Sequence, residues 1–160
     1  MTDSPADIYQ RHLDAMTDAV WARDAEAIAA LIDAEVDVVT GGHPGPSVTR
    51  DAAVATYLSF RQAMQGVGAT SYHRICTNAA VVAPDELDGT HVTYIMRGGN
   101  YVIDPYACDQ TLRRHGAVWL MAGIRCERHH LGGASFGGGP SRIRGPQPEA
   151  RTPDPERTIP

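Results

Sequence analysis

The sequence lacks an apolar run long enough for a transmembrane helix. Its longest apolar stretches stop far short of the roughly 20 residues that span a bilayer, so no membrane span is expected. A secretory signal is also missing, because the N-terminal stretch MTDSPADIYQRHLDAM is acidic and polar where such a signal is first basic and then apolar. Both absences predict a cytoplasmic protein that does not bind membranes.

An excess of positive charge is absent as well. The chain has 14 lysine and arginine residues against 19 acidic ones, which gives a formal net charge of −5. Nucleic-acid phosphates are bound by concentrated basic faces, so no nucleic-acid partner is expected. The glycine-rich stretches GGNY (98–101) and GGASFGGGP lack the strand–loop–helix setting of a phosphate loop, and this argues against nucleotide binding.

Closely spaced cysteines are the third absence. Cys76, Cys108 and Cys126 are odd in number and far apart, with no CxxC pair, which argues against a disulfide framework or a zinc ribbon. We expect three small buried thiols in a reducing compartment. Cys126, His129 and His130 form C-x-x-H-H without a carboxylate or a second cluster, so we assign no metal and no cofactor.

The chain is long enough, and apolar enough, for one domain with a core. It has 160 residues, of which 42% are hydrophobic. From residue 131 onward the sequence consists mainly of glycine, proline and charged residues, which cannot bury enough apolar area to offset the entropy of ordering. We therefore predict a domain over residues 1–130 and a flexible tail over 131–160.

Helical signals fill the N-terminal half. Ser4 or Asp7 can cap a helix that runs to about Ala22, and Asp24 can cap a short second helix whose apolar positions extend to Ile32. A strand at 36–39 ends at the sequence GGHPGP, and a third helix starts at 47–49 and stops near 66.

The period of apolar residues changes to two after residue 70. Such alternation predicts a long antiparallel sheet with a closing hairpin about His115–Gly116. Helices followed by strands are typical of an α+β fold, and a twisted sheet of this length should curl around the helices and leave a pocket. The strands are expected at 70–82, 90–96, 106–114 and 117–128, with a turn at 84–89.

Three phrases carry a resemblance to a known family. AVWARDAEAIAALIDAEVDVV, HRICTNAAVV and LRRHGAVWLMAGIRCER, in the order two helices, strand, helix and four strands, resemble the SnoaL-like branch of the nuclear transport factor two-like superfamily. The resemblance covers about Ile8 to Arg128. It implies a cone-shaped α+β barrel with a deep apolar pocket. Members include polyketide cyclases, ketosteroid isomerases, dehydratases and many proteins without a known activity, so fold transfers better than function.

The resemblance also suggests catalytic residues. Dehydratase-type relatives pair a helix-one aspartate with a sheet histidine that acts as general base or acid. Trp21 stands at the position of that aspartate. His73 lies near the position of the histidine, and it points into the pocket only if a bulge absorbs one residue. Asp14, or Asp109 at the acid position of the isomerase pattern, can supply a carboxylate; the other interpretation is that His73 and Asp14 are simply solvated.

Seven side chains are candidates for the pocket wall. Tyrosine hydroxyls can donate to a substrate oxygen, although aromatic residues in a half-buried sheet are more often plain core. Trp21 is expected to close or line the pocket in place of a carboxylate; an ideal helical wheel sets it on the side of Asp14, away from Val20, and so also allows a surface or dimer-contact position. The seven are Met16, Trp21, Tyr57, Tyr94, Met96, Tyr106 and Trp119.

Two functions follow as hypotheses. The first is a cofactor-free lyase or isomerase that acts by proton transfer on a small apolar cyclic substrate. The second is a non-catalytic small-molecule-binding or assembly module that has lost the aspartate. A carboxyl oxygen within hydrogen-bonding distance of the His73 ring, inside a cavity, would favour the first.

We also expect a homodimer through the outer face of the sheet, because alternation leaves apolar residues such as Val118, Leu120 and Ile124 on the face opposite to Trp119.

Overall fold

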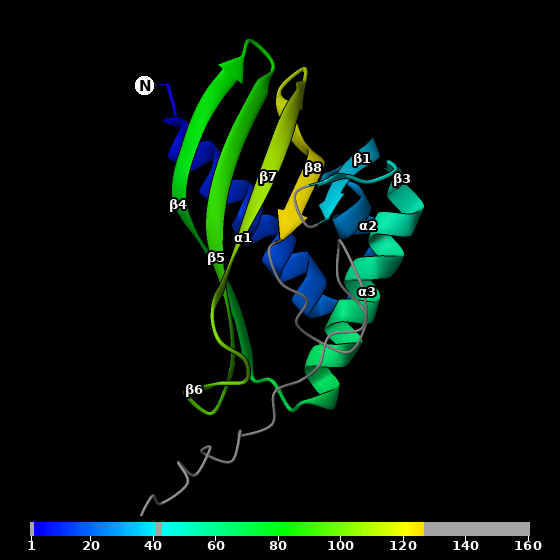
Figure 1. The fold of residues 1–160 in the computed structure, drawn as a ribbon, viewed down its shortest axis with the longest axis vertical. Helices are drawn as coiled ribbons and strands as arrows, with labels where there is room; N and C mark the ends of the chain where they lie inside the picture. The colour runs from blue at the N-terminus through cyan, green and yellow to red at the C-terminus, as the bar shows by residue number, and fades with distance from the viewer. Residues whose placement is uncertain (1, 41–42, 127–160) are drawn as a thin grey trace, which may run out of the picture.

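The computed structural model describes residues 2–40 and 43–126, and it has the expected α+β architecture. A long curved sheet wraps around helix α1 (Pro5–Ala22), and helix α3 (Arg50–Gly66) packs beside the first strand (Figure 1). The short helix α2 (Ala25–Ala29) connects α1 to that strand. The prediction of a cone-shaped fold is confirmed. The predicted tail, 131–160, lies outside the described residues.

The sheet is mixed. Its strand order is β2-β1-β8-β7-β5-β4, with β3 paired to β1 and β6 paired to β5. Strands β1 and β8 run parallel, and the other pairs are antiparallel. The strands are β1 (Ile32–Thr40), β2 (His43–Pro44), β3 (Val48–Thr49), β4 (Ser71–Ala83), β5 (Glu86–Arg97), β6 (Asn100–Tyr101), β7 (Tyr106–His115) and β8 (Val118–Cys126).

Capping side chains define the helix starts that the sequence predicted. The Ser4 hydroxyl accepts a hydrogen bond from the Asp7 amide, and the Asp7 carboxylate accepts one from the Ser4 amide. Asp24 caps α2 and Thr49 caps α3, each accepting from the amide three residues later. Each cap satisfies an amide that the first helical turn leaves without a partner, which typically contributes about 1 kcal/mol.

Two predicted boundaries are wrong. The second helix ends at Ala29, and Ile32 begins β1 opposite Met121 of β8, because pairing and complete burial outweigh its helical spacing. Residues 86–89, expected in a turn, pair with both neighbouring strands, so the turn is confined to 84–85.

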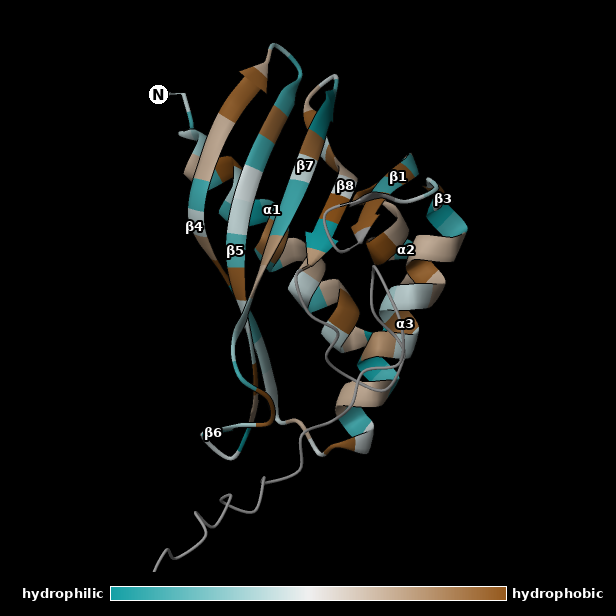
Figure 2. Cartoon of the chain, viewed as in Figure 1, coloured by the Kyte–Doolittle hydropathy of each residue, from teal (hydrophilic) through white to brown (hydrophobic). Residues whose placement is uncertain are grey.

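One face of α1 forms the centre of the core. Its buried stripe is Tyr9, Leu13, Met16 and Val20, at helical spacing, and Figure 2 shows apolar and polar residues alternating along the strands around it. Complete burial of a side chain such as Leu13 contributes roughly 1.5–3 kcal/mol. Gly89 on β5 lies under Tyr9 so closely that a Cβ there would overlap the tyrosine ring. The core therefore requires glycine at this position.

A β-bulge in β8 changes which side chains face the interior. The ladder between β7 and β8 skips Ala122, so Met121 and Ile124 are both buried in the core. The sequence analysis assumed strict alternation, which places Ile124 on the outer face with Val118 and Leu120. That expectation is wrong, because the bulge turns Ile124 inward. The apolar outer face on which the homodimer prediction rests is correspondingly smaller, and the dimer stays a prediction.

Cys108 and Cys126 form a disulfide, so the prediction of three thiols is wrong. The two residues lie directly opposite each other on β7 and β8, a proximity that their spacing in the sequence does not reveal. Cys76 remains free and half-buried. Disulfides are typical of oxidising compartments, which conflicts with the cytoplasmic location expected from the sequence. Within the described ranges, no helix is long and apolar enough to cross a membrane.

Candidate functional site

The interior of the cone contains a charged side chain, Arg74 of β4. Alternation along this strand turns Tyr72 and Arg74 inward and His73 outward, and only 4% of Arg74 is exposed. None of the ion pairs among residues 2–40 and 43–126 includes Arg74. Because a guanidinium stays protonated in proteins, Arg74 is a buried positive charge with no acidic partner among these residues.

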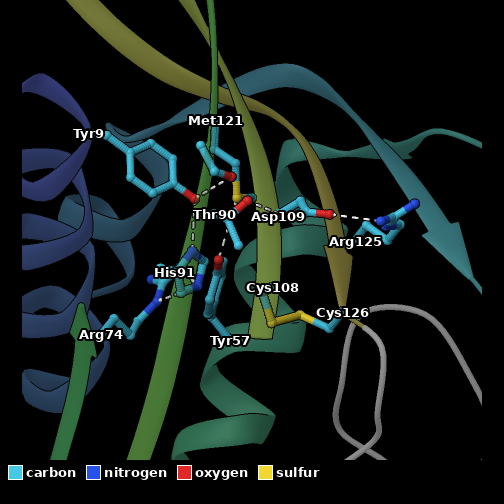
Figure 3. The surroundings of a disulfide bond; sticks show 11 residues. Tyr9, Tyr57, Arg74, Thr90, His91, Cys108, Asp109, Met121, Arg125 and Cys126 are labelled. Atoms are coloured by element: carbon cyan, nitrogen blue, oxygen red, sulfur yellow. Dashed lines mark hydrogen bonds and ion pairs between the residues drawn. A yellow bond between two sulfur atoms is a disulfide. The ribbon is translucent and has the colours of Figure 1, made fainter. Parts of the chain in front are cut away.

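A hydrogen-bonded chain fixes Arg74 in place (Figure 3). Its Nε and Nη2 atoms each lie 3.3 Å from Nε2 of His91 on β5. Nδ1 of His91 lies 2.8 Å from the Tyr9 hydroxyl, which lies 2.9 Å from the carbonyl oxygen of Gly89. Since arginine only donates, His91 accepts at Nε2 and donates from Nδ1 to Tyr9, whose hydroxyl then donates to Gly89.

His91 is neutral in this chain. Burial, together with the positive charge of Arg74 and the proximity of His12, lowers the pKa of His91 to about 2. Both of its ring nitrogens are engaged, so His91 positions the guanidinium without compensating its charge.

Four tyrosine side chains lie close enough to Arg74 for its positive charge to change their pKa values. Burial raises the pKa of each, and the positive charge of Arg74 acts in the opposite direction. For Tyr72 the result is a pKa of about 12. These hydroxyls therefore stay neutral near pH 7, where they can donate or accept hydrogen bonds but cannot balance a cation. The four are Tyr9, Tyr57, Tyr72 and Tyr106.

Three inward side chains from three different elements have buried polar atoms without a partner. These atoms are Nη1 of Arg74 on β4, Nε2 and Oε1 of Gln110 on β7, and Nδ1 of His12 on α1. Gln110 is 2% exposed and His12 is 5% exposed. Buried polar atoms nearly always have a hydrogen-bond partner in native proteins, and each one without a partner costs about 1–3 kcal/mol. Such a set of donors and acceptors suits a polar ligand.

These side chains lie near one another. The charge of Arg74 contributes to lowering the pKa of His12, and hydrogen bonds with Arg74 and Gln110 act to lower the pKa of the Tyr57 hydroxyl against its burial. The Tyr57 hydroxyl also lies 3.4 Å from the sulfur of Met121, beside the apolar side chains of the core. The interior thus combines a cation, hydroxyls and an apolar surface, whereas the resemblance implied a deep apolar pocket without a buried cation.

A separate hollow of about 580 Å³ lies on the outer face of the sheet. Asp109 is in its wall, where it accepts a hydrogen bond from Thr90 at 2.8 Å and forms an ion pair with Arg125 at 2.9 Å. Figure 3 shows Asp109 and Arg125 on the opposite side of β7 from His91. The outward side chains that line this hollow and the inward Arg74 thus lie on opposite faces of the sheet.

The predicted catalytic residues are not brought together. His73 is exposed on the outer face, because the bulge in β4 follows Cys76 and does not shift His73. Asp14 is exposed on α1 and accepts a hydrogen bond from Gln10. Asp109 faces outward. Among the described residues, no carboxylate hydrogen-bonds to His73, so the expected acid–base pair does not form.

The predicted pocket residues divide between the two faces. Met16 and Tyr57 are buried inside, and Tyr106 is half-buried close to Arg74. Tyr94 and Met96 belong to the opposite phase of β5 and face outward, so their placement in the pocket is wrong.

The two tryptophans lie at the margins of the core. Trp21 is half-buried and packs under Arg61 of α3, whose guanidinium carbon lies 4.0 Å from the centre of the indole ring. Trp119 is half-buried near the start of β8, with Arg114 at 5.7 Å from its ring. These contacts fit the surface position that the helical wheel also allows for Trp21, and its role in closing or lining the pocket stays a prediction.

The sequence held signals for the residues that were missed. Tyr9 and His12 share the helical stripe of Met16, so both belong to the inward face of α1. On β4, assigning Tyr72 to the interior would have assigned Arg74 to it as well, since the two are separated by one residue. The sequence spacing alone does not show which residues of β4 face inward, because this depends on the position of the bulge in that strand.

Comparisons with known proteins identify the fold. No family model matches the chain, and no curated protein matches its sequence. A domain of unknown function with a cystatin-like fold from Nostoc punctiforme has a TM-score of 0.59 at 16% identity, over 81% of this chain and 80% of that one. An NTF2-like protein of unknown function from Shewanella oneidensis has a TM-score of 0.58 at 9% identity, over 78% and 99%.

A proposed dehydratase of the NTF2-like family from Streptomyces avermitilis is also similar. Its TM-score is 0.53 at 18% identity, over 76% of this chain and 94% of that one. Likeness at these identities shows a shared fold only. The chain therefore has the NTF2-like fold, and its function has to be argued from its own residues.

Proposed function

We propose that this protein binds a small cyclic organic molecule inside the cone through an oxyanion of the ligand, held by Arg74. The observation that carries the proposal is the buried guanidinium, which has no acidic partner among the described residues and an unpaired Nη1 atom. A carboxylate, phenolate or enolate oxygen is the natural acceptor for this group.

The energetics favour an anion over a neutral ligand. A buried charge without a counter-charge costs several kcal/mol, and an incoming oxyanion offsets this cost while pairing with the free donor. The Gln110 amide can supply a further hydrogen bond, because its contact with the Tyr57 hydroxyl leaves other donor and acceptor positions of the amide open. Apolar side chains such as Met16 and Met121 offer contacts for the ring of the ligand.

The cofactor-free lyase or isomerase hypothesis in its first form has less support. It required His73 as base beside a carboxylate, and His73 is exposed on the other face of the sheet. The binding hypothesis needs neither residue. The homodimer and the cytoplasmic location remain predictions, which the proposed function does not require.

Isothermal titration calorimetry with 2-naphthoate and the neutral 2-naphthamide tests the proposal. A charge-assisted hydrogen bond contributes about 1.5–3 kcal/mol, so naphthoate should bind roughly 10–100-fold more tightly than the amide. Arg74→Met should abolish this preference. The matched control is Arg97→Met, which removes an exposed arginine of β5 and should leave the preference intact. Equal affinities for both probes in the unaltered protein would refute the proposal.

A further inference from the structure

Two arginines without an acidic partner lie at the junction of α1 and α3. Arg23 ends α1, and Arg61 lies on α3 beside Trp21. None of the ion pairs of the described residues includes either arginine. The carboxylate of Asp24, next to Arg23 in the chain, accepts a hydrogen bond from the Ala27 amide at the start of α2. The junction therefore carries two guanidinium charges with which no described carboxylate forms an ion pair.

Two hydrogen bonds hold the arginines side by side. On α3, Arg61 and Gln65 are one turn apart and so share one face of the helix. Nε of Arg61 donates to the Trp21 carbonyl oxygen at 3.0 Å, and Nη2 of Arg23 donates to Oε1 of Gln65. Burial lowers the pKa of Arg61, and the positive charge of Arg23 lowers it further, which requires the two guanidinium groups to be close. Two like charges are thus held together at the margin of the core.

Both guanidinium groups are oriented and still have free donors. Arg61 lies over the Trp21 ring, with its guanidinium carbon 4.0 Å from the ring centre, and its two Nη groups make no hydrogen bond to a described residue. The Nε and Nη1 groups of Arg23 make none either. Arg23 is exposed and Arg61 is half-buried, so both can be reached from solvent. Because existing contacts already fix these side chains, a ligand orders them at little further entropic cost.

Capping of α1 explains only part of this arrangement. Cations near the end of a helix interact favourably with its last carbonyl groups, and Arg61 does so through Trp21. One cation is enough for that role. The second, Arg23, adds repulsion, and it has a left-handed conformation (φ 58°) that only glycines otherwise adopt among the described residues. An anion bound between the two side chains would offset the repulsion.

We propose that Arg23 and Arg61 together bind a phosphate group, at a site separate from the Arg74 interior. A phosphate dianion carries the two negative charges that balance two guanidinium groups, and its oxygens can accept hydrogen bonds from both. A carboxylate would leave one positive charge unbalanced. The inference does not rest on the proposed function, because the arginines belong to a different part of the fold. The group can belong to a soluble phosphate compound or to a lipid head group, since both present the same oxygens.

Titration with inorganic phosphate at about pH 8, where phosphate is mainly a dianion, tests the inference by two-dimensional NMR of the backbone amides. Saturable shifts should appear at the end of α1 and in the middle of α3. Arg23→Gln and Arg61→Gln should each weaken phosphate binding by roughly 10–100-fold, the usual effect of losing a charge-assisted hydrogen bond. The matched control is Arg11→Gln, which removes an arginine of α1 that is paired with Asp3 and should leave the affinity unchanged.

Sedimentation with phosphatidylcholine vesicles, with and without phosphatidic acid, identifies the source of the group. Binding only to vesicles that contain phosphatidic acid, and its loss in Arg23→Gln, would support the site with a lipid head group as its ligand. Phosphate binding without vesicle binding would support the site with a soluble phosphate compound as its ligand.

Chloride, measured in the same way, separates a phosphate site from general attraction of anions. The inference is overturned if chloride shifts the same amides with equal affinity, if phosphate causes no saturable shift, or if both glutamine variants bind phosphate as tightly as the unaltered protein. Arg74→Met should retain phosphate binding, and its loss there would place the phosphate in the interior and also overturn the inference. Should Arg61→Gln not fold, Arg23→Gln decides, because this exposed side chain makes a single hydrogen bond to a described residue.

Discussion

The arginine side chains on the two faces of the sheet have different partners. On the outer face Arg125 pairs with Asp109 at 2.9 Å, where both side chains are partly exposed. On the inner face Arg74 meets a neutral histidine and no carboxylate among the described residues. An exposed ion pair is worth about 0–1 kcal/mol, whereas a buried cation without a counter-charge is destabilising by several kcal/mol. Polar side chains on the outer face are solvated and need no special explanation, whereas those on the inner face are what the proposed ligand would explain.

The largest expected difference between the faces comes from two glycines. Gly89 faces inward, where a Cβ would overlap the Tyr9 ring, and Gly123 faces outward, where a Cβ would lie 3.4 Å from Thr111, an ordinary contact. Gly89→Ala should therefore lower the free energy of unfolding by about 2–3 kcal/mol through overpacking. Gly123→Ala should change it by less than about 0.5 kcal/mol.

Urea unfolding followed by circular dichroism measures both variants. Displacement of Tyr9 should also break its hydrogen bond to His91, so naphthoate binding should weaken in Gly89→Ala. If both alanine variants are equally stable, α1 does not pack against the sheet as closely as the structure has it.

The second prediction compares Arg74→Met with Arg125→Met in the ligand-free protein. Arg74→Met removes an unpaired buried cation, at the cost of leaving the His91 acceptor unpaired, and we expect a net gain in unfolding free energy of about 1–2 kcal/mol. Arg125→Met removes one partner of an exposed pair and should cost about 0–1 kcal/mol. The two substitutions should thus have opposite signs.

Thermal unfolding of the two variants, with and without 2-naphthoate, completes this test. Naphthoate should raise the melting temperature of Arg125→Met and leave that of Arg74→Met unchanged, because a ligand stabilises only the state that it binds. A less stable Arg74→Met protein would mean that Arg74 serves the fold and not a ligand.

The fold could be read from the sequence because its signals are local. Caps at Ser4, Asp24 and Thr49 mark three helix starts, and the change of apolar period after residue 70 marks the sheet. These patterns depend on neighbouring residues only. The exceptions, such as Ile32, are positions where a distant strand decides the local structure.

The site could not be read in the same way, because it depends on the phase of each strand. His73 and Arg74 are adjacent in sequence and lie on opposite faces, and the location of a single bulge decides which one is inside. Tyr57 was easier to place, since it lies on helix α3, whose apolar stripe is unambiguous. Cys108 and Cys126 meet through register between two strands, which spacing along the chain does not encode.

Trp21, at the position where the family resemblance implies an aspartate, lies near the end of α1 at the margin of the core. It is half-buried between α1 and α3, with the Arg61 guanidinium over its ring and the Arg61 Nε donating to its carbonyl oxygen at 3.0 Å. An exposed cation–π contact contributes about 0.5–1 kcal/mol, much less than a fully buried aromatic ring. The contacts of Trp21 therefore cover the margin of the core between α1 and α3.

The smallest expected effect is that of changing Trp21. Trp21→Ala should cost about 1 kcal/mol of unfolding free energy, against roughly 3–5 kcal/mol for the control Phe60→Ala, whose ring is 8% exposed and packs edge-on against Tyr72. Trp21→Asp should also fold, because its carboxylate would face Arg61 and water and would not be buried without a partner. Neither variant should alter the binding of naphthoate. A loss of naphthoate binding in Trp21→Asp, in a protein that still unfolds cooperatively, would show that the α1–α3 junction communicates with Arg74, and the separation between the rim of the cone and its interior would then be wrong.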